Sequence, residues 1–165
     1  MILVVSDTSP IRALANLQRL DLLPELFVEV VVPPAVEREL RNSPKGLATV
    51  DLGEYPFIRV QAVTDRTAVT RFLLKLDEGE SEALALALEV GADLILLDEA
   101  ADRHAAKRAG LTPLGVLGVL LEAKQRRLIE SLSPLLDQLQ DDYRFFITPR
   151  LRAEVLRSAG EFPLS

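Results

Sequence analysis

The 165-residue sequence has no cysteine, no tryptophan and a single histidine, His104. Without cysteine, disulfides and thiolate metal sites are excluded. A single histidine argues against a zinc site, which needs several His or Cys ligands, and it disfavours serine–histidine catalysis. The few glycines form neither the G-x-G-x-x-G nor the G-x-x-x-x-G-K-[ST] phosphate-binding pattern. The chemistry of this chain is therefore expected to come from its oxygen-bearing side chains.

Long hydrophobic runs are also missing. The first apolar run ends at Asp7, too early for the core of a signal peptide, and no later run approaches the roughly 18 to 20 apolar residues of a membrane span. We therefore expect a cytoplasmic protein with no membrane partner. The net charge is −6, with 25 acidic against 19 basic residues. This balance argues against broad coating of nucleic acid, but it is compatible with a nuclease whose acids hold metal ions.

Strand-like and helix-like segments alternate along the chain. Its length and 48% hydrophobic content suit one domain over residues 1–165, with a core at about 1–129 and C-terminal helices within 130–160. The apolar runs predicted as strands are 2–5, 28–32, 58–63, 94–97 and 112–114. Helical segments separate them, so we predict an α/β fold, a three-layer α/β/α sandwich with a mainly parallel central sheet.

One segment, 83–88, is ambiguous because alanine and leucine alternate strictly in it, as residues of a strand can. We predict a helix over 79–90, because alanine and leucine have high helix propensity and both partners of the alternation are apolar. A helix with leucine on every side is expected in the centre of the protein.

Acidic residues follow two of the predicted strands. Asp7 comes directly after the first strand and precedes Ser9, a favourable helix N-cap. Asp98 ends the strand 94–97, and Asp102 lies one helical turn further on the same face. Ligands of open α/β sheets bind in the crevice beyond the carboxyl ends of the strands. These acids are therefore expected in that crevice.

Three further acids lie on predicted helices. At 100° per residue, Glu39 falls inside the buried arc of the helix that begins near Ala35, and a carboxylate that faces inward needs a partner or a metal ion. Glu80 and Glu82 occupy the first turn of the helix 79–90, where the helix dipole favours acids. Four acids from separate elements, with oxygen ligands only, favour a hard cation such as Mg²⁺ or Mn²⁺.

Each acid also has a purely structural interpretation. Asp7 and Asp98 can accept hydrogen bonds from backbone amides at strand-to-helix turns, and Glu80 and Glu82 can be ordinary acids of a first helical turn. The joint pattern, with one acid in each of four elements, is what points to a metal site.

Several short motifs resemble those of PIN-domain proteins of the VapC-like toxin type, within an uncharacterised PIN subfamily. The opening strand and Asp-x-Ser motif correspond to Val5–Ser9, and the segment V-P-x-x-V-x-x-E-L corresponds to Val32–Leu40. The segment G-E-x-E-A corresponds to Gly79–Ala83, and a strand ending in paired acids corresponds to Leu96–Glu99. The resemblance is closest from residue 2 to about 129.

This resemblance implies a metal-binding, catalytic quartet of Asp7, Glu39, Glu82 and Asp98. Ser9, Glu99 and Asp102 are possible auxiliaries, and Glu82 is preferred to Glu80 because it directly precedes the alanine–leucine run. The second of the paired acids is usually Asp and is Glu99 here, and Val116 replaces the threonine that usually follows Gly115.

The same resemblance implies a Mg²⁺- or Mn²⁺-dependent endoribonuclease that acts on RNA. It also implies the role of a toxin, inhibited by a small cognate antitoxin, and a homodimer. Three other functions stay open. A haloacid-dehalogenase-like phosphatase also begins with a strand-tip aspartate, but Ser9 stands where its second aspartate is expected. A non-catalytic PIN-fold interaction protein and a phosphate-accepting receiver are the other two.

Overall fold

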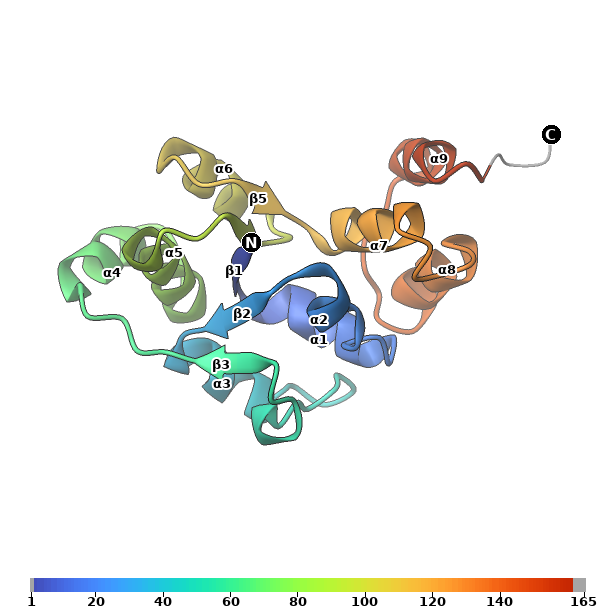
Figure 1. Cartoon of the computed structure of the whole chain (residues 1–165). Helices are drawn as coiled ribbons and strands as arrows, with labels where there is room; N and C mark the ends of the chain where they lie inside the picture. Colours follow the sequence, from blue (N-terminus) through green and yellow to red (C-terminus); the bar gives the residue numbers. More distant parts are fainter. Residues whose placement is uncertain (1, 162–165) are drawn as a thin grey trace.

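The centre of the molecule is one five-stranded sheet in the order β3-β2-β1-β4-β5, and every neighbouring pair of strands is parallel. A computed structural model describes residues 2–161 (Figure 1). The strands are β1 (Leu3–Ser6), β2 (Glu29–Val32), β3 (Ile58–Val60), β4 (Leu94–Leu96) and β5 (Pro113–Leu114). Helices flank this sheet, which confirms the predicted α/β class.

Helices account for most of the remaining chain. They are α1 (Thr8–Asn16), α2 (Leu22–Leu26), α3 (Pro34–Arg41), α4 (Arg66–Leu73), α5 (Glu78–Val90), α6 (Ala100–Arg108), α7 (Val116–Gln125), α8 (Ser133–Asp141) and α9 (Pro149–Ser158), with a 3₁₀ turn η1 (Leu52–Glu54). In Figure 1, α4 and α5 lie on one side of the sheet, and α1, α2 and α7 lie on the other. Within residues 2–161, no helix has the length and apolar character needed to cross a membrane.

The apolar runs form the core because both faces of a parallel sheet are covered by helices. Val4 and Val5 of β1 are fully buried, as are Ile95 and Leu96 of β4. Helix α5 packs against both of these strands and is buried along most of its length. The segment 83–88 is therefore helical, as predicted, and lies in the centre of the protein.

The start of α1 differs from the prediction. The helix begins at Thr8, so Asp7 is the N-cap residue and Ser9 is the second residue of the helix rather than its cap. The backbone of Asp7 is still extended and its N–H donates to the carbonyl of Leu96 over 3.0 Å, which continues the pairing of β1 with β4 by one residue. The chain thus turns from strand to helix with no intervening loop.

The crevice of the sheet lies between the carboxyl ends of β1 and β4. From β1 the chain moves to β2 and β3 on one side, and it then crosses back to β4 and β5 on the other side. Such a reversal of direction is where ligands of open α/β sheets bind. Helix α3 contacts both α1 and α5, so it connects the two helical layers.

Candidate metal centre

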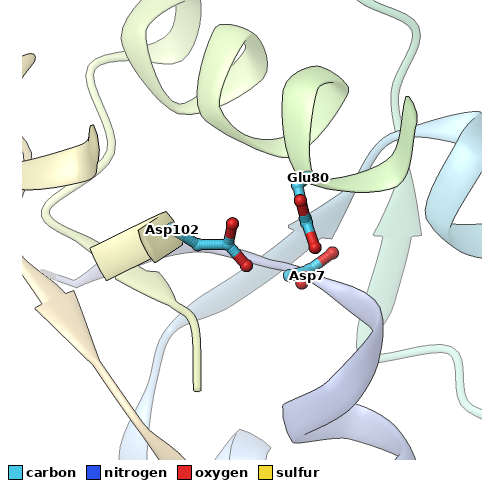
Figure 2. Close-up of side chains that lie close together, drawn as sticks. All are labelled: Asp7, Glu80 and Asp102. Atoms are coloured by element: carbon cyan, nitrogen blue, oxygen red, sulfur yellow. The ribbon is translucent and has the colours of Figure 1, made fainter. Parts of the chain in front are cut away.

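Three carboxylates meet at this crevice. Asp7 follows β1, Glu80 belongs to the first turn of α5 and Asp102 to the first turn of α6. One oxygen of each lies within 4.8 Å of the chosen oxygens of the other two. Figure 2 shows these side chains converging from three separate elements. We refer to Asp7, Glu80 and Asp102 as the acidic triad.

Two members of the acidic triad, Asp7 and Asp102, are buried, and Glu80 is half-buried. Asp7 is 5% exposed and Asp102 is 1% exposed, and Oδ2 of Asp102 has no hydrogen-bond partner. Within residues 2–161, no Lys or Arg forms an ion pair with any of the three acids. Buried carboxylates without a counter-charge are costly, so they either hold protons or bind a cation.

The pKa values of the acidic triad reflect this environment. Burial raises the pKa of Asp7 to about 7, and the charges of Glu39 and Glu80 contribute to the rise. Burial and the neighbouring charge of Glu80 raise the pKa of Asp102 to about 8. Burial also raises the pKa of Glu80. At neutral pH the metal-free triad therefore retains protons that a bound cation would displace.

Glu80 is held in place by a capping box at the start of α5. Asp77 is the N-cap residue, and its side chain accepts a hydrogen bond of 2.8 Å from the N–H of Glu80. In return, the carboxylate of Glu80 accepts a hydrogen bond of 3.1 Å from the N–H of Asp77. The reciprocal pair of hydrogen bonds fixes the orientation of the Glu80 side chain at the start of α5.

Glu82, which the resemblance placed in the quartet, is engaged elsewhere. Its Oε2 accepts a hydrogen bond of 2.9 Å from the N–H of Ala35 in α3, and its Oε1 pairs with Arg66 of α4 at 3.1 Å. Pro33, the N-cap residue of α3, supplies no side-chain cap. Glu82 therefore caps α3 from another helix, and the geometry favours Glu80 over Glu82 as a metal ligand, the reverse of the predicted order.

Asp98 also has structural partners and lies outside the acidic triad. Its Oδ1 accepts a hydrogen bond of 2.8 Å from the N–H of Val116, the first residue of α7, and its Oδ2 lies 3.4 Å from Oγ of Ser9. Burial raises the pKa of Asp98, while the contacts with Val116 and Ser9 oppose the rise. Asp98 thus joins the end of β4 to the start of α7, with Ser9 beside it.

Gly115 permits this arrangement because it has no side chain. A Cβ at Gly115 would lie 2.9 Å from Oδ1 of Asp98 and 2.9 Å from a guanidinium nitrogen of Arg103. Both distances are shorter than real carbon contacts allow. Any larger residue at this position would therefore displace the side chain of Asp98 or of Arg103.

Glu39 approaches the triad from α3 and is half-buried. Its carboxylate accepts a hydrogen bond of 2.5 Å from the hydroxyl of Thr8, the residue after Asp7, and its charge raises the pKa of Asp7. Glu99 is exposed at the N-cap position of α6 and makes no capping hydrogen bond with its side chain. Of the predicted residues, the structure brings Asp7 and Asp102 together and places Glu39 beside Asp7. Asp98 and Ser9 contact one another.

From the sequence, Thr8 was overlooked and Glu80 was ranked too low as a candidate metal ligand. Thr8 was not singled out, although a buried threonine next to Asp7 could have been noticed. Glu80 was ranked below Glu82, although Asp77 and Glu80 have the three-residue spacing of a capping box, and that pattern could have indicated that the Glu80 side chain is held at the end of the helix.

The fold is that of a PIN-like α/β domain, and comparison with known proteins identifies the family. Residues 3–161 match the sequence profile of DUF3368, described as a PIN domain. The chain therefore belongs to this PIN-domain family. PIN domains are a family of nucleases that typically depend on divalent metal ions.

A structural neighbour supports the fold. A PilT N-terminus domain protein from the hyperthermophilic archaeon Sulfolobus solfataricus P2 is similar, with a TM-score of 0.52 and 17% sequence identity. The similarity covers 74% of this chain and 92% of that one. Among curated proteins, no match was found.

The residues present fit a divalent cation. The acidic triad offers carboxylate oxygens only, which are the ligands preferred by hard cations. The buried Oδ2 of Asp102, which has no hydrogen-bond donor, is the observation in best agreement with such an ion, because a cation would supply the missing partner.

Proposed function

We propose that this protein is an endoribonuclease that depends on Mg²⁺ or Mn²⁺ and hydrolyses RNA phosphodiester bonds. The observation that supports it is the acidic triad at the switch point of a parallel sheet, in which Asp7 and Asp102 are buried and one oxygen of Asp102 has no hydrogen-bond partner. The membership of a nuclease family and the motifs around Asp7 and Glu39 support the same function.

In the proposed mechanism, Asp7, Glu80 and Asp102 would hold the cation and Glu39 would add negative charge beside Asp7. A bound divalent cation lowers the pKa of water and neutralises charge on the phosphodiester. The chain's own residues orient the site: the capping box fixes Glu80, and the start of α1 fixes Asp7 next to β4. Because the acids must lose protons to bind a cation, affinity rises with pH through the raised pKa values of Asp7 and Asp102.

The biological role we propose is that of the toxin of a toxin–antitoxin pair in the cytoplasm. The proposed partners are a small antitoxin and a second copy of this chain. Expression of the wild-type protein should arrest growth, and co-expression of a small neighbouring reading frame should relieve the arrest. Light scattering of the purified protein should give the mass of a dimer. Growth without any arrest would contradict the toxin role and would leave a housekeeping nuclease.

A cleavage assay tests the activity itself. Wild-type protein is incubated with a mixture of structured and unstructured RNAs, with Mn²⁺ or with a chelator, and Asp7→Asn is the test variant. We expect cleavage with Mn²⁺ only, and none by Asp7→Asn although it remains folded. Asp21→Asn is the matched control, because Asp21 is an exposed partner of Arg19 in a surface ion pair and should not matter.

The alternative functions are distinguished by the activity of Asp7→Asn, by phosphate release, and by calorimetry together with toxicity. Full activity of Asp7→Asn would refute the assignment of the site. Release of inorganic phosphate from small phosphoesters without cleavage of RNA would favour the phosphatase. No calorimetric signal with Mn²⁺ and no toxicity would favour a non-catalytic interaction protein.

A further inference from the structure

Thr8 joins two acids of the site through its side chain. It is the first residue of α1, directly after Asp7, and is 4% exposed. Its hydroxyl donates a hydrogen bond of 2.5 Å to Oε2 of Glu39 on α3. Hydrogen bonds from a hydroxyl to a carboxylate are short and strong because one partner is charged. Thr8 therefore ties the Glu39 side chain to the residue next to Asp7.

Gly79 lies against the other side of the same carboxylate. A Cβ at Gly79, in the first turn of α5, would lie 2.8 Å from both Cδ and Oε2 of Glu39 and nearer still to Oε1. The carboxylate of Glu39 thus rests on the backbone of α5, one residue before Glu80. Its position is confined between the residue after Asp7 and the residue before Glu80.

The backbone that carries Glu39 is also held. The guanidinium of Arg12 on α1 donates a hydrogen bond of 3.0 Å to the carbonyl of Glu39 and another of 3.2 Å to the hydroxyl of Ser43. These bonds hold α3 to α1 whether or not the side chain of Glu39 is engaged. The bond from Thr8 is thus available to orient the carboxylate rather than to join the two helices.

We infer that Thr8 is a positioning residue: its hydroxyl holds the Glu39 carboxylate against Gly79 and beside Asp7, so that Glu39 adds a fourth carboxylate to the cation site. This inference rests on the proposed metal-dependent function. It extends that function because it assigns a role to a residue that carries no charge and binds no ion itself.

The test compares Thr8→Val, which keeps the shape but loses the hydroxyl, with Thr8→Ser, which keeps the hydroxyl. The readout is the affinity for Mn²⁺ alone, measured by calorimetry on the full chain. We expect Thr8→Val to weaken Mn²⁺ binding about tenfold, the lower end of the loss when a group that orients a ligand is removed. Thr8→Ser should restore most of the affinity. Thr70→Val is the control, because Thr70 donates to the carbonyl of Arg66 within α4, away from the acids.

A double-mutant cycle separates positioning from a general structural role. In the Glu39→Gln background, Thr8→Val should weaken Mn²⁺ binding no further, because the carboxylate that it orients is already gone. Additive losses, or a lower stability of Thr8→Val with unchanged Mn²⁺ affinity, would overturn the inference. Gly79→Ala is the second variant, because its added methyl group displaces the carboxylate of Glu39 from the side of α5. It tests the inference even if Thr8→Val does not fold. Full Mn²⁺ affinity in Gly79→Ala would also overturn the inference.

Measurements on the wild-type protein distinguish a failure of the proposed function from a failure of the role of Thr8. A wild-type protein that binds no Mn²⁺ would overturn the proposed function and this inference with it. A wild-type protein that binds Mn²⁺ and cleaves RNA, with Thr8→Val equal to it in affinity, would overturn only the role of Thr8.

Discussion

The carboxylate of Glu82 accepts a hydrogen bond of 2.9 Å from the backbone N–H of Ala35, which connects the second turn of α5 to the first turn of α3. The first N–H groups of a helix have no partner within the helix, and the N-cap residue of α3 is Pro33, which has no polar side chain. Glu82 supplies the missing acceptor, and Arg66 balances its charge at 3.1 Å.

This relationship predicts a structural effect of Glu82→Ala. Removal of the acceptor leaves the buried N–H of Ala35 unpaired, so we expect the free energy of unfolding to fall by about 1–3 kcal/mol. Urea denaturation measures the change. The control is Glu78→Ala in the same helix, which removes only an exposed ion pair with Arg38 and should cost less than about 1 kcal/mol. Equal losses in the two variants would contradict the role of Glu82 as a cap.

Substitutions of Glu80 and of Glu82 are expected to have different effects on metal binding. Glu80→Gln removes a charge from the acidic triad and should weaken Mn²⁺ binding about tenfold or more, because a carboxylate of the site is lost. Glu82→Gln should leave the affinity nearly unchanged, since Glu82 binds Ala35 and Arg66 instead. Calorimetric titration of both variants with Mn²⁺ checks this. The opposite order of affinities would restore Glu82 as the ligand that the sequence motif suggested.

The stability of the metal-free protein should fall as the pH rises from about 5 to 8. Asp7 has a pKa of about 7 and Asp102 of about 8 in the folded protein, against an ordinary value of 3.8. Between these values the folded state binds more protons than the unfolded state. The free energy of unfolding therefore falls as the pH rises through the folded pKa values. Glu161, whose pKa is lowered, is ionised in both states above pH 5 and does not change this slope.

Asp102→Asn tests the origin of that pH dependence. The variant lacks one of the buried titrating groups, so its stability in chelator should depend less on pH, and it should exceed wild type at pH 8. Thermal unfolding at several pH values measures both effects. Addition of Mn²⁺ at pH 8 should stabilise wild type more than the variant. If the stability of Asp102→Asn depended on pH as steeply as that of wild type, the acidic triad would not be the source of the pH dependence.

The C-terminal helices depend on a similar cap. Glu161 accepts hydrogen bonds of 2.7 Å from the N–H of Leu132 and 3.2 Å from the N–H of Ser133 at the start of α8, and it lies 3.5 Å from Nζ of Lys124. Glu161→Ala should lower the free energy of unfolding by about 1–3 kcal/mol, because these N–H groups lose their acceptor. Mn²⁺ affinity should stay at the wild-type value, and a loss of affinity would indicate a link between α8 and the site.

The parts of the fold that depend on local pattern could be predicted from the sequence. Runs of valine, isoleucine and leucine predicted the strands near 2–5, 28–32 and 94–97. The sequence Thr148-Pro149 is likewise typical of a helix start, and in the structure the hydroxyl of Thr148 accepts a hydrogen bond of 3.1 Å from the N–H of Leu151 in α9. The short helix α2 was missed, since its five residues hold too few turns to show a helical period.

The placement of acids at strand ends was likewise determined by the sequence, because an aspartate that directly follows a buried strand of a parallel sheet can only lie at its carboxyl edge. The tertiary structure decided which acids meet there. Helix α5 is apolar on nearly every side, so its periodicity could not show whether Glu80 or Glu82 faces the crevice. The hydrogen bonds of Glu82 to Ala35 and of Asp98 to Val116 join residues 47 and 18 positions apart. Such partners exist only once the helices have packed together, because a carboxylate binds whichever donor folding brings within reach.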